Sequence, residues 1–117
     1  MHYPVRRITT PLTIASSGTT ITSSAFQING ILRGICVNAP ALTSSNTYTV
    51  SIIDDNGYTV FSKASLTANA KTSIFVDTNN NYLQFPVSGR AYTITVTSSG
   101  TEGSARVFSV DLLTQGT

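Results

Sequence analysis

The sequence predicts an all-β chain that folds as an antiparallel β-sandwich, with a jelly roll as one candidate arrangement and an extended N-terminal arm. Polar and apolar residues alternate with period two in several short runs, as in strands that bury one face and leave the other in water. Turn residues separate these runs at roughly the 8–12-residue intervals typical of sandwiches. No long window carries the three-and-four spacing of an amphipathic helix. Because the loops are irregular in length, two packed sheets are favoured over a closed barrel.

Residues 1–24 differ from the rest of the chain. Pairs of Ser and Thr interrupt short apolar stretches there, and Pro4 and Pro11 disfavour a central strand, because proline cannot donate to a sheet ladder. We expect this segment to form an N-terminal arm or edge-strand segment that lies along a neighbouring subunit or partner. An ordinary first strand pair of the same sandwich is the alternative. Residues 25–117 are expected to form the β-sandwich domain.

The apolar run over residues 31–37 predicts the next strand. It contains Cys36, the single cysteine, which excludes an intramolecular disulfide and is expected to be a small buried hydrophobe. Arg33 is in phase with Ile31, Ile35 and Val37 of the same run. It is therefore expected either to extend its charged head into water from the rim of the sheet or to be paired within a subunit contact.

Residues 47–53 and 58–64 predict a β-hairpin. The connecting Asp54-Asp55-Asn56-Gly57 contains the Asn-Gly pair that is typical of a tight turn. Its acidic residues also suggest a calcium loop, but no bidentate acid follows at the required spacing. The hairpin is therefore the favoured interpretation.

Two long alternating runs, residues 92–97 and 106–114, predict the last strands. The second run places its apolar residues on one face and Ser109 and Asp111 on the other, so Asp111 is expected to face outward. Residues 98–104 between the two runs are rich in Gly and Ser. They are expected to form a long, flexible loop.

Charge is scarce and hydroxyl groups are abundant. Asp, Glu, Lys and Arg make up 10% of the residues, against about 25% in an ordinary soluble domain, whereas Ser and Thr account for 34 of the 117 residues. Low charge suits a protein that presses against partners, because a buried unpaired charge is costly. The basic residues are scattered apart from Arg6 and Arg7, so no nucleic-acid binding is expected. Without a long apolar run or an export signal, we expect no membrane association and folding in a cytoplasm.

No catalytic, cofactor-binding or metal-binding constellation is expected. The single histidine, His2, is close to the chain terminus. Four of the five acidic residues fall in turns or at a strand end, where solvated acids are common; these are Asp54, Asp55, Asp77 and Glu102. Acid–base catalysis needs such groups to face one another across a cleft, and the sequence gives no sign of that arrangement.

An aromatic platform for carbohydrate binding is not expected either. The chain has no Trp, and Tyr48, Tyr58 and Tyr92 fall in apolar rows, where a Tyr is usually buried. Only Tyr3 and Tyr82 are expected to be exposed. Two separate tyrosines are a weak signal for sugar stacking.

The order of these motifs resembles that of a known class of proteins. A Thr/Ser-rich start leads into Phe26-Gln27-Ile28-Asn29-Gly30-Ile31-Leu32-Arg33-Gly34-Ile35, followed by Thr49-Val50-Ser51-Ile52-Ile53-Asp54-Asp55-Asn56-Gly57 and by Tyr92-Thr93-Ile94-Thr95-Val96-Thr97. This pattern resembles small β-sandwich structural proteins of tailed-bacteriophage virions. The resemblance spans most of the chain, and no functional residue transfers with it. It implies a virion role, as a decoration or cement protein made in the host cytoplasm and bound to the exterior of the capsid.

That resemblance also implies partners. The major capsid protein or other virion proteins are expected, and a homotrimer is expected because capsids present local threefold positions. Tyr3, Arg6 and Arg7 of the arm, together with Arg33, are the expected contact residues. A receptor- or glycan-binding module of a tail or fibre is one alternative, and a neck, tail or baseplate component is another. An enzyme is the least favoured class.

Overall fold

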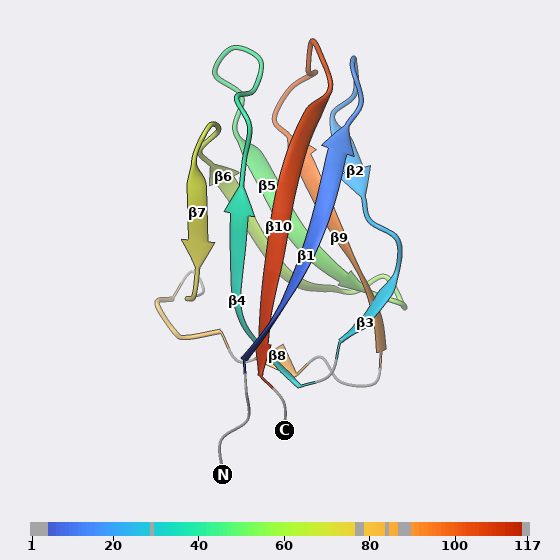
Figure 1. The fold of residues 1–117 in the computed structure, drawn as a ribbon, viewed down its shortest axis with the longest axis vertical. Helices are drawn as coiled ribbons and strands as arrows, with labels where there is room; N and C mark the ends of the chain where they lie inside the picture. Colours follow the sequence, from blue (N-terminus) through green and yellow to red (C-terminus); the bar gives the residue numbers. More distant parts are fainter. Residues whose placement is uncertain (1–4, 29, 77–78, 84, 87–89, 116–117) are drawn as a thin grey trace.

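Two antiparallel β-sheets pack face to face in this chain (Figure 1). The computed structural model describes residues 5–28, 30–76, 79–83, 85–86 and 90–115. Sheet A contains, in spatial order, β1 (Val5–Ile14), β10 (Arg106–Gln115), β4 (Ile31–Asn38) and β7 (Lys71–Ile74), with β8 (Phe85–Pro86) also paired to β4. Sheet B contains β2 (Thr20–Thr22), β9 (Arg90–Ser98), β5 (Tyr48–Asp54) and β6 (Thr59–Leu66), with β3 (Phe26–Ile28) also paired to β9. The predicted all-β antiparallel sandwich is confirmed.

The strands pair in a nested order. β1 pairs with β10, β2 and β3 pair with β9, β4 pairs with β7 and β8, and β5 pairs with β6 at the centre of the nest. The chain therefore behaves as one long hairpin that is wrapped so that its successive strand pairs fall in alternate sheets. This strand order is that of a jelly roll.

The core lies between the sheets and follows from the period-two alternation. Along β10, Phe108, Val110 and Leu112 are completely buried, as are Val50 and Ile52 of β5 in the opposite sheet. The Phe108 ring meets the ring of Tyr48 edge to face, with their centroids 5.1 Å apart. Burial of these side chains, at roughly 1.5–3 kcal/mol each, is the main stabilising contribution.

The β5–β6 hairpin forms as predicted. Asp54 Oδ1 accepts hydrogen bonds from the backbone N–H groups of Asn56 and Tyr58, at 3.0 and 2.9 Å. Gly57 takes the left-handed conformation, with φ of 84°. The Asp54 carboxylate is thus used to close a turn, which agrees with the hairpin and not with a calcium loop.

Among the described tyrosines, the observed burial differs from the prediction at one residue. Tyr48 and Tyr92 are buried and Tyr82 is exposed, as expected. The prediction for Tyr58 was wrong, because 71% of this residue is exposed. It lies in the turn just before β6 begins, where no second sheet covers it. Tyr3 lies outside the described residues.

The N-terminal segment contributes two strands at sheet edges. β1 pairs with β10 over its whole length, and β2 pairs with the outer side of β9. Pro11 thus lies in an edge strand, as expected from its missing N–H group. Contact between residues 1–24 and a neighbouring subunit stays a prediction.

A β-bulge changes the phase of β4. Leu113 of β10 pairs with Gly34, but the next residue, Thr114, pairs with Leu32, so Arg33 is the extra residue. The prediction that Arg33 shares a face with Ile35 and Val37 was therefore wrong.

The prediction for Cys36 was also wrong. Ile35 and Val37 both face the core, so Cys36 between them faces outward and is half-buried. Its thiol lies 3.6 Å from the hydroxyl of Ser73, to which it donates.

Candidate interaction surfaces

A buried carboxylate closes the end of the sandwich at which β10 begins. Glu102 is completely buried, and its two oxygens accept four hydrogen bonds. The donors are Thr43 N and Asn46 Nδ2, both at 2.8 Å, Ser98 Oγ at 2.6 Å and Arg106 Nε at 3.0 Å. Burial by itself raises the pKa of this carboxyl, but the donors from Ser98, Asn46, Thr43 and Arg106 together lower it from 4.5 to about 2.

Two expectations about this loop were therefore wrong. Glu102 is not a solvated turn residue, and it holds residues 98–104 against the loop that precedes β5. The backbone agrees, because Glu102 N donates to Gly18 O at 3.0 Å and Ser17 N donates to Glu102 O at 2.8 Å. Since no oxygen of this carboxylate is exposed, its role is structural.

The outer face of sheet A, called the sheet A face below, mixes charged, polar and apolar side chains. Its outward residues on the inner strands are Ile31, Arg33, Cys36 and Asn38 of β4 and Val107, Ser109, Asp111, Leu113 and Gln115 of β10. β1 adds Arg7, Thr9, Pro11 and Thr13, and β7 adds Lys71 and Ser73.

Asp111 faces outward with Ser109, as predicted. Its Oδ2 accepts a hydrogen bond from Arg7 Nη1 at 3.0 Å, and its Oδ1 is buried without a partner in the described part of the chain. The Arg7 side chain is 61% exposed and that of Asp111 only 17% exposed. Asp111 thus presents almost none of its carboxylate to solvent.

Beside this pair the sheet A face is hollowed. The hollow measures about 350 Å³ and has Arg7 and Lys71 among its lining residues. The small side chains of Cys36, Ser73 and Ser109 also line it, and their size explains why the surface is depressed there.

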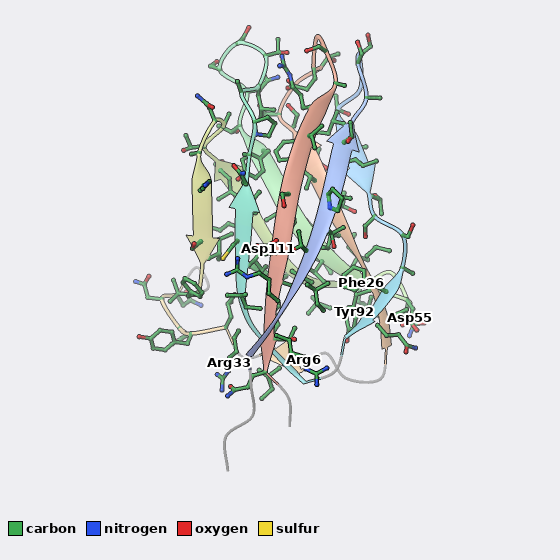
Figure 2. All side chains as sticks on the ribbon, viewed as in Figure 1. Arg6, Phe26, Arg33, Asp55, Tyr92 and Asp111 are labelled. Atoms are coloured by element: carbon green, nitrogen blue, oxygen red, sulfur yellow. The ribbon has the colours of Figure 1, made fainter. Side chains whose placement is uncertain are left out.

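Three of the four predicted contact residues come together at one end of sheet A. Arg6 and Arg33 both lie where β1 begins and β10 ends (Figure 2). Arg7 of β1 pairs with Leu113 of β10, and Leu113 pairs on its other side with Gly34 of β4, the residue after Arg33. Two strand spacings, about 10 Å of backbone, therefore separate the arginines of β1 from Arg33. Tyr3, the fourth predicted residue, lies outside the described residues.

Arg33 is half-buried and has a polar partner. Its Nε donates to Gln115 Oε1 at 3.0 Å. This neutral partner orients the guanidinium without cancelling its charge. Arg33 is therefore at the rim of the sheet with an intrachain partner, and its pairing within a subunit contact stays a prediction.

The sheet A face also carries apolar side chains that sequence reasoning missed. Phe75 is 45% exposed and Val107 59% exposed. A Cβ on Gly34 would lie 2.7 Å from two ring atoms of Phe75, so the ring rests directly on this glycine. A glycine inside an apolar strand pattern is a sequence signal for such a close approach.

The outer face of sheet B, called the hydroxyl face below, is different. Rows of Ser and Thr cross it, and neighbours in a row pair through their hydroxyls: Thr20 with Thr97 at 3.1 Å, Thr22 with Thr95 at 3.0 Å and Ser51 with Ser62 at 2.9 Å. Among the outward side chains that are described on β2, β3, β5 and β9, none is charged.

The open side of the sandwich forms a groove between β1 and the β2–β3 segment. It measures about 470 Å³, and Ile8, Leu12, Ile21 and Phe26 supply apolar wall. Between β2 and β3 the regular strand pairing with β9 is interrupted, and Ser23 forms the hydrogen bonds to β9 there. Its backbone N–H donates to Ile94 O and its Oγ accepts from Ile94 N, each at 2.9 Å.

The described residues contain neither a metal-ligand cluster nor a membrane-spanning helix. No three His, Cys, Asp or Glu side chains within that part of the chain converge as metal ligands. Nor do those residues include a helix long and apolar enough to cross a membrane.

Comparison with known proteins shows that this chain is similar to others in fold. The sequence matches no protein-family model and no curated protein. The structure is similar to a chain in the capsid asymmetric unit of cyanophage Pam1, with a TM-score of 0.66 and 12% identity, over 99% of this chain and 87% of that chain. It is also similar to part of dimeric latent PorU from Porphyromonas gingivalis, with a TM-score of 0.52 and 15% identity, over 99% of this chain and 13% of PorU. At these identities the likeness shows a shared fold.

Proposed function

We propose that this chain is a non-enzymatic structural protein of a virion, a decoration or cement protein that binds the exterior of a tailed-phage head and stabilises it. The observation that carries the proposal is the end-to-end likeness to one chain of a phage capsid, at a TM-score of 0.66. Because the alignment spans nearly all of both chains, it relates two single-domain chains of similar length. A small domain without a visible catalytic site suits accessory binding to a shell.

The scarcity of charge in this chain supports a protein that works by adhesion. Exposed charge is sparse, so docking desolvates few ions, and each desolvated unpaired ion would cost several kcal/mol. One copy has modest contact area, but repetition over a shell multiplies the effect when copies are linked. We therefore place the protein on the capsid surface, with the major capsid protein or another virion protein as its partner.

The proposal includes a homotrimer, which would match local threefold positions on a shell. Light scattering of the purified chain tests this point. A particle of three times the 12.4 kDa mass of one chain is expected, and a monomer mass would contradict the trimer. Tyr3, Arg6, Arg7 and Arg33 stay the proposed contact residues. Alanine at each position should weaken assembly or docking while the chain remains folded.

The proposed function is tested on particles made from the genome that encodes this chain. The chain should co-purify with DNA-filled heads at a fixed ratio to the major capsid protein, and cryo-electron microscopy should show its sandwich outside the shell. Heads made without it should release DNA at a lower temperature than complete heads. Finding the chain only in tails, or not in particles, would overturn the proposal.

A further inference from the structure

We propose that the sheet A face, and not the hydroxyl face, docks on the partner, and that the partner presents an acidic protein surface there. This inference rests on the proposed function and names the chemistry of the contact. It follows from the distribution of charge, from the apolar side chains and from the hollow.

Among the described residues, the charge on the sheet A face is predominantly positive. Arg7, Arg33 and Lys71 point outward from it, and Arg6 lies at its end. Asp111, the one acid on this face within the described part of the chain, has one oxygen on Arg7 and the other buried. The face therefore offers positive charge to a partner, and a complementary partner surface is acidic.

The composition of the two faces points the same way. Contact cores are enriched in Arg and aromatic residues and depleted in Ser. The sheet A face holds arginines together with exposed Phe75 and Val107. On the hydroxyl face, Ser and Thr hydroxyls already bond to one another along the rows. The hydroxyl face is thus the one suited to remain in solvent.

The hollow identifies where a partner side chain would enter. Arg7 and Lys71 supply positive charge at its lining, and Ser73, Ser109 and Asn38 supply groups that donate hydrogen bonds. Asp111 also lines the hollow, with one carboxylate oxygen on Arg7 and the other buried. A protruding Asp or Glu side chain fits this set, because a carboxylate accepts several hydrogen bonds and is attracted by both cations.

A protein partner is favoured over a nucleic acid. Tight binding to duplex DNA depends on many phosphate contacts, and only three cations, Arg7, Arg33 and Lys71, point outward from this face among the described residues. The apolar area of Phe75 and Val107 would gain nothing against phosphates, whereas it is buried usefully against a protein.

The test compares two variants with the same net charge. Arg33→Gln with Lys71→Gln removes two positive charges from the sheet A face. Thr97→Glu with Ser62→Glu adds two negative charges to the exposed hydroxyl face. Both variants therefore shift the formal net charge of the chain equally. Thermal melting first confirms that each is folded, and the binding of each to heads that lack the chain is then titrated.

We expect the Arg33/Lys71 variant to bind at least about tenfold more weakly than the unmodified chain, and the Thr97/Ser62 variant to bind like it. Binding of the unmodified chain should also weaken as NaCl is raised, because exposed charge pairs are screened. Loss of binding only in the Thr97/Ser62 variant would overturn the assignment of the face and leave the proposed function standing. Absence of binding by the unmodified chain would overturn both.

A 30-base-pair DNA duplex serves as the competing partner. The unmodified chain should not bind it at the protein concentration that saturates heads. Binding of comparable strength that is lost in the Arg33/Lys71 variant would overturn the acidic-protein assignment in favour of a nucleic acid.

Discussion

Arg106 Nε lies 3.0 Å from Glu102 Oε1, and this ion pair joins the β9–β10 loop to the start of β10. Glu102 is completely buried, while the Arg106 side chain is 23% exposed. Arg106 also donates to Thr43 Oγ1 at 3.2 Å, so the pair reaches the loop before β5. Two loops that are about 60 residues apart in sequence are thereby fixed to each other.

Replacing Glu102 should destabilise the fold. Glu102→Ala leaves the donors of Ser98, Asn46 and Thr43 without their acceptor, and we expect a loss of about 3 kcal/mol in the free energy of unfolding. Urea denaturation at neutral pH measures it. Thr101→Ala, at the exposed neighbouring position, is the control and should change stability by less than about 0.5 kcal/mol. Equal stability of the two variants would contradict the structural role.

Stability should fall in acid through the same carboxyl. The pKa of Glu102 is about 2 in the folded chain against an ordinary value of 4.5. The folded-state value is the lower one, so the contribution is fully present above about pH 4.5 and is lost as the pH falls toward 2. The gap corresponds to about 3 kcal/mol.

The measurement is urea denaturation at several pH values between neutrality and pH 2. Glu102→Gln removes the titrating group and should flatten the profile in this window. The same acid dependence in both proteins would assign it to other carboxyls.

Truncating Phe108 should lower the free energy of unfolding far more than truncating its neighbour Val107. Phe108 is completely buried against Tyr48 between the sheets, whereas Val107 is 59% exposed. We expect Phe108→Ala to lower the free energy of unfolding by about 3–5 kcal/mol and Val107→Ala by less than about 0.5 kcal/mol. Similar losses at both positions would contradict the inward and outward assignment of β10.

Two glycines should respond in opposite ways to alanine. Gly57 has a φ of 84° and no atom within 4 Å of an added Cβ, so only backbone strain opposes Gly57→Ala. We expect a loss of about 1 kcal/mol.

Gly103 is the matched control for Gly57. Its Cβ would meet only Thr43 Oγ1, at 3.7 Å, and its backbone is outside the left-handed region. Gly103→Ala should leave stability unchanged or raise it slightly, by up to about 1 kcal/mol, because the unfolded chain loses freedom. Thermal or urea denaturation compares the two, and an equal loss at both positions would contradict the assigned turn.

The hairpin and the core strands were predictable because their causes are local. Asn56 and Gly57 set the turn by their own backbone preferences, and alternation in β10 sorts Phe108 from Ser109 without knowledge of any other strand. The candidate contact surface was predictable only in part. Arg6, Arg7 and Arg33 were singled out by charge. No local pattern in the sequence predicts that β1 and β4 both pair with β10, which brings these residues to one end of sheet A.

The errors have a shared physical cause. The bulge at Arg33 is defined by the pairing of Gly34 with Leu113 and of Leu32 with Thr114, far along the chain, and it puts Arg33 on the face opposite Ile35 and Val37. Glu102 looked like a solvated loop residue because its donors Thr43 and Asn46 are equally remote in sequence.

By itself the sequence determined an all-β chain with one buried face per strand, since alternation, turn residues and scarce charge act within a few residues of one another. Only the tertiary structure decided the nested jelly-roll order, the sheet on whose outer face each outward residue lies and the burial of Glu102. These depend on which distant strands pair and in which register, and a shift of one residue in register moves a side chain from core to solvent.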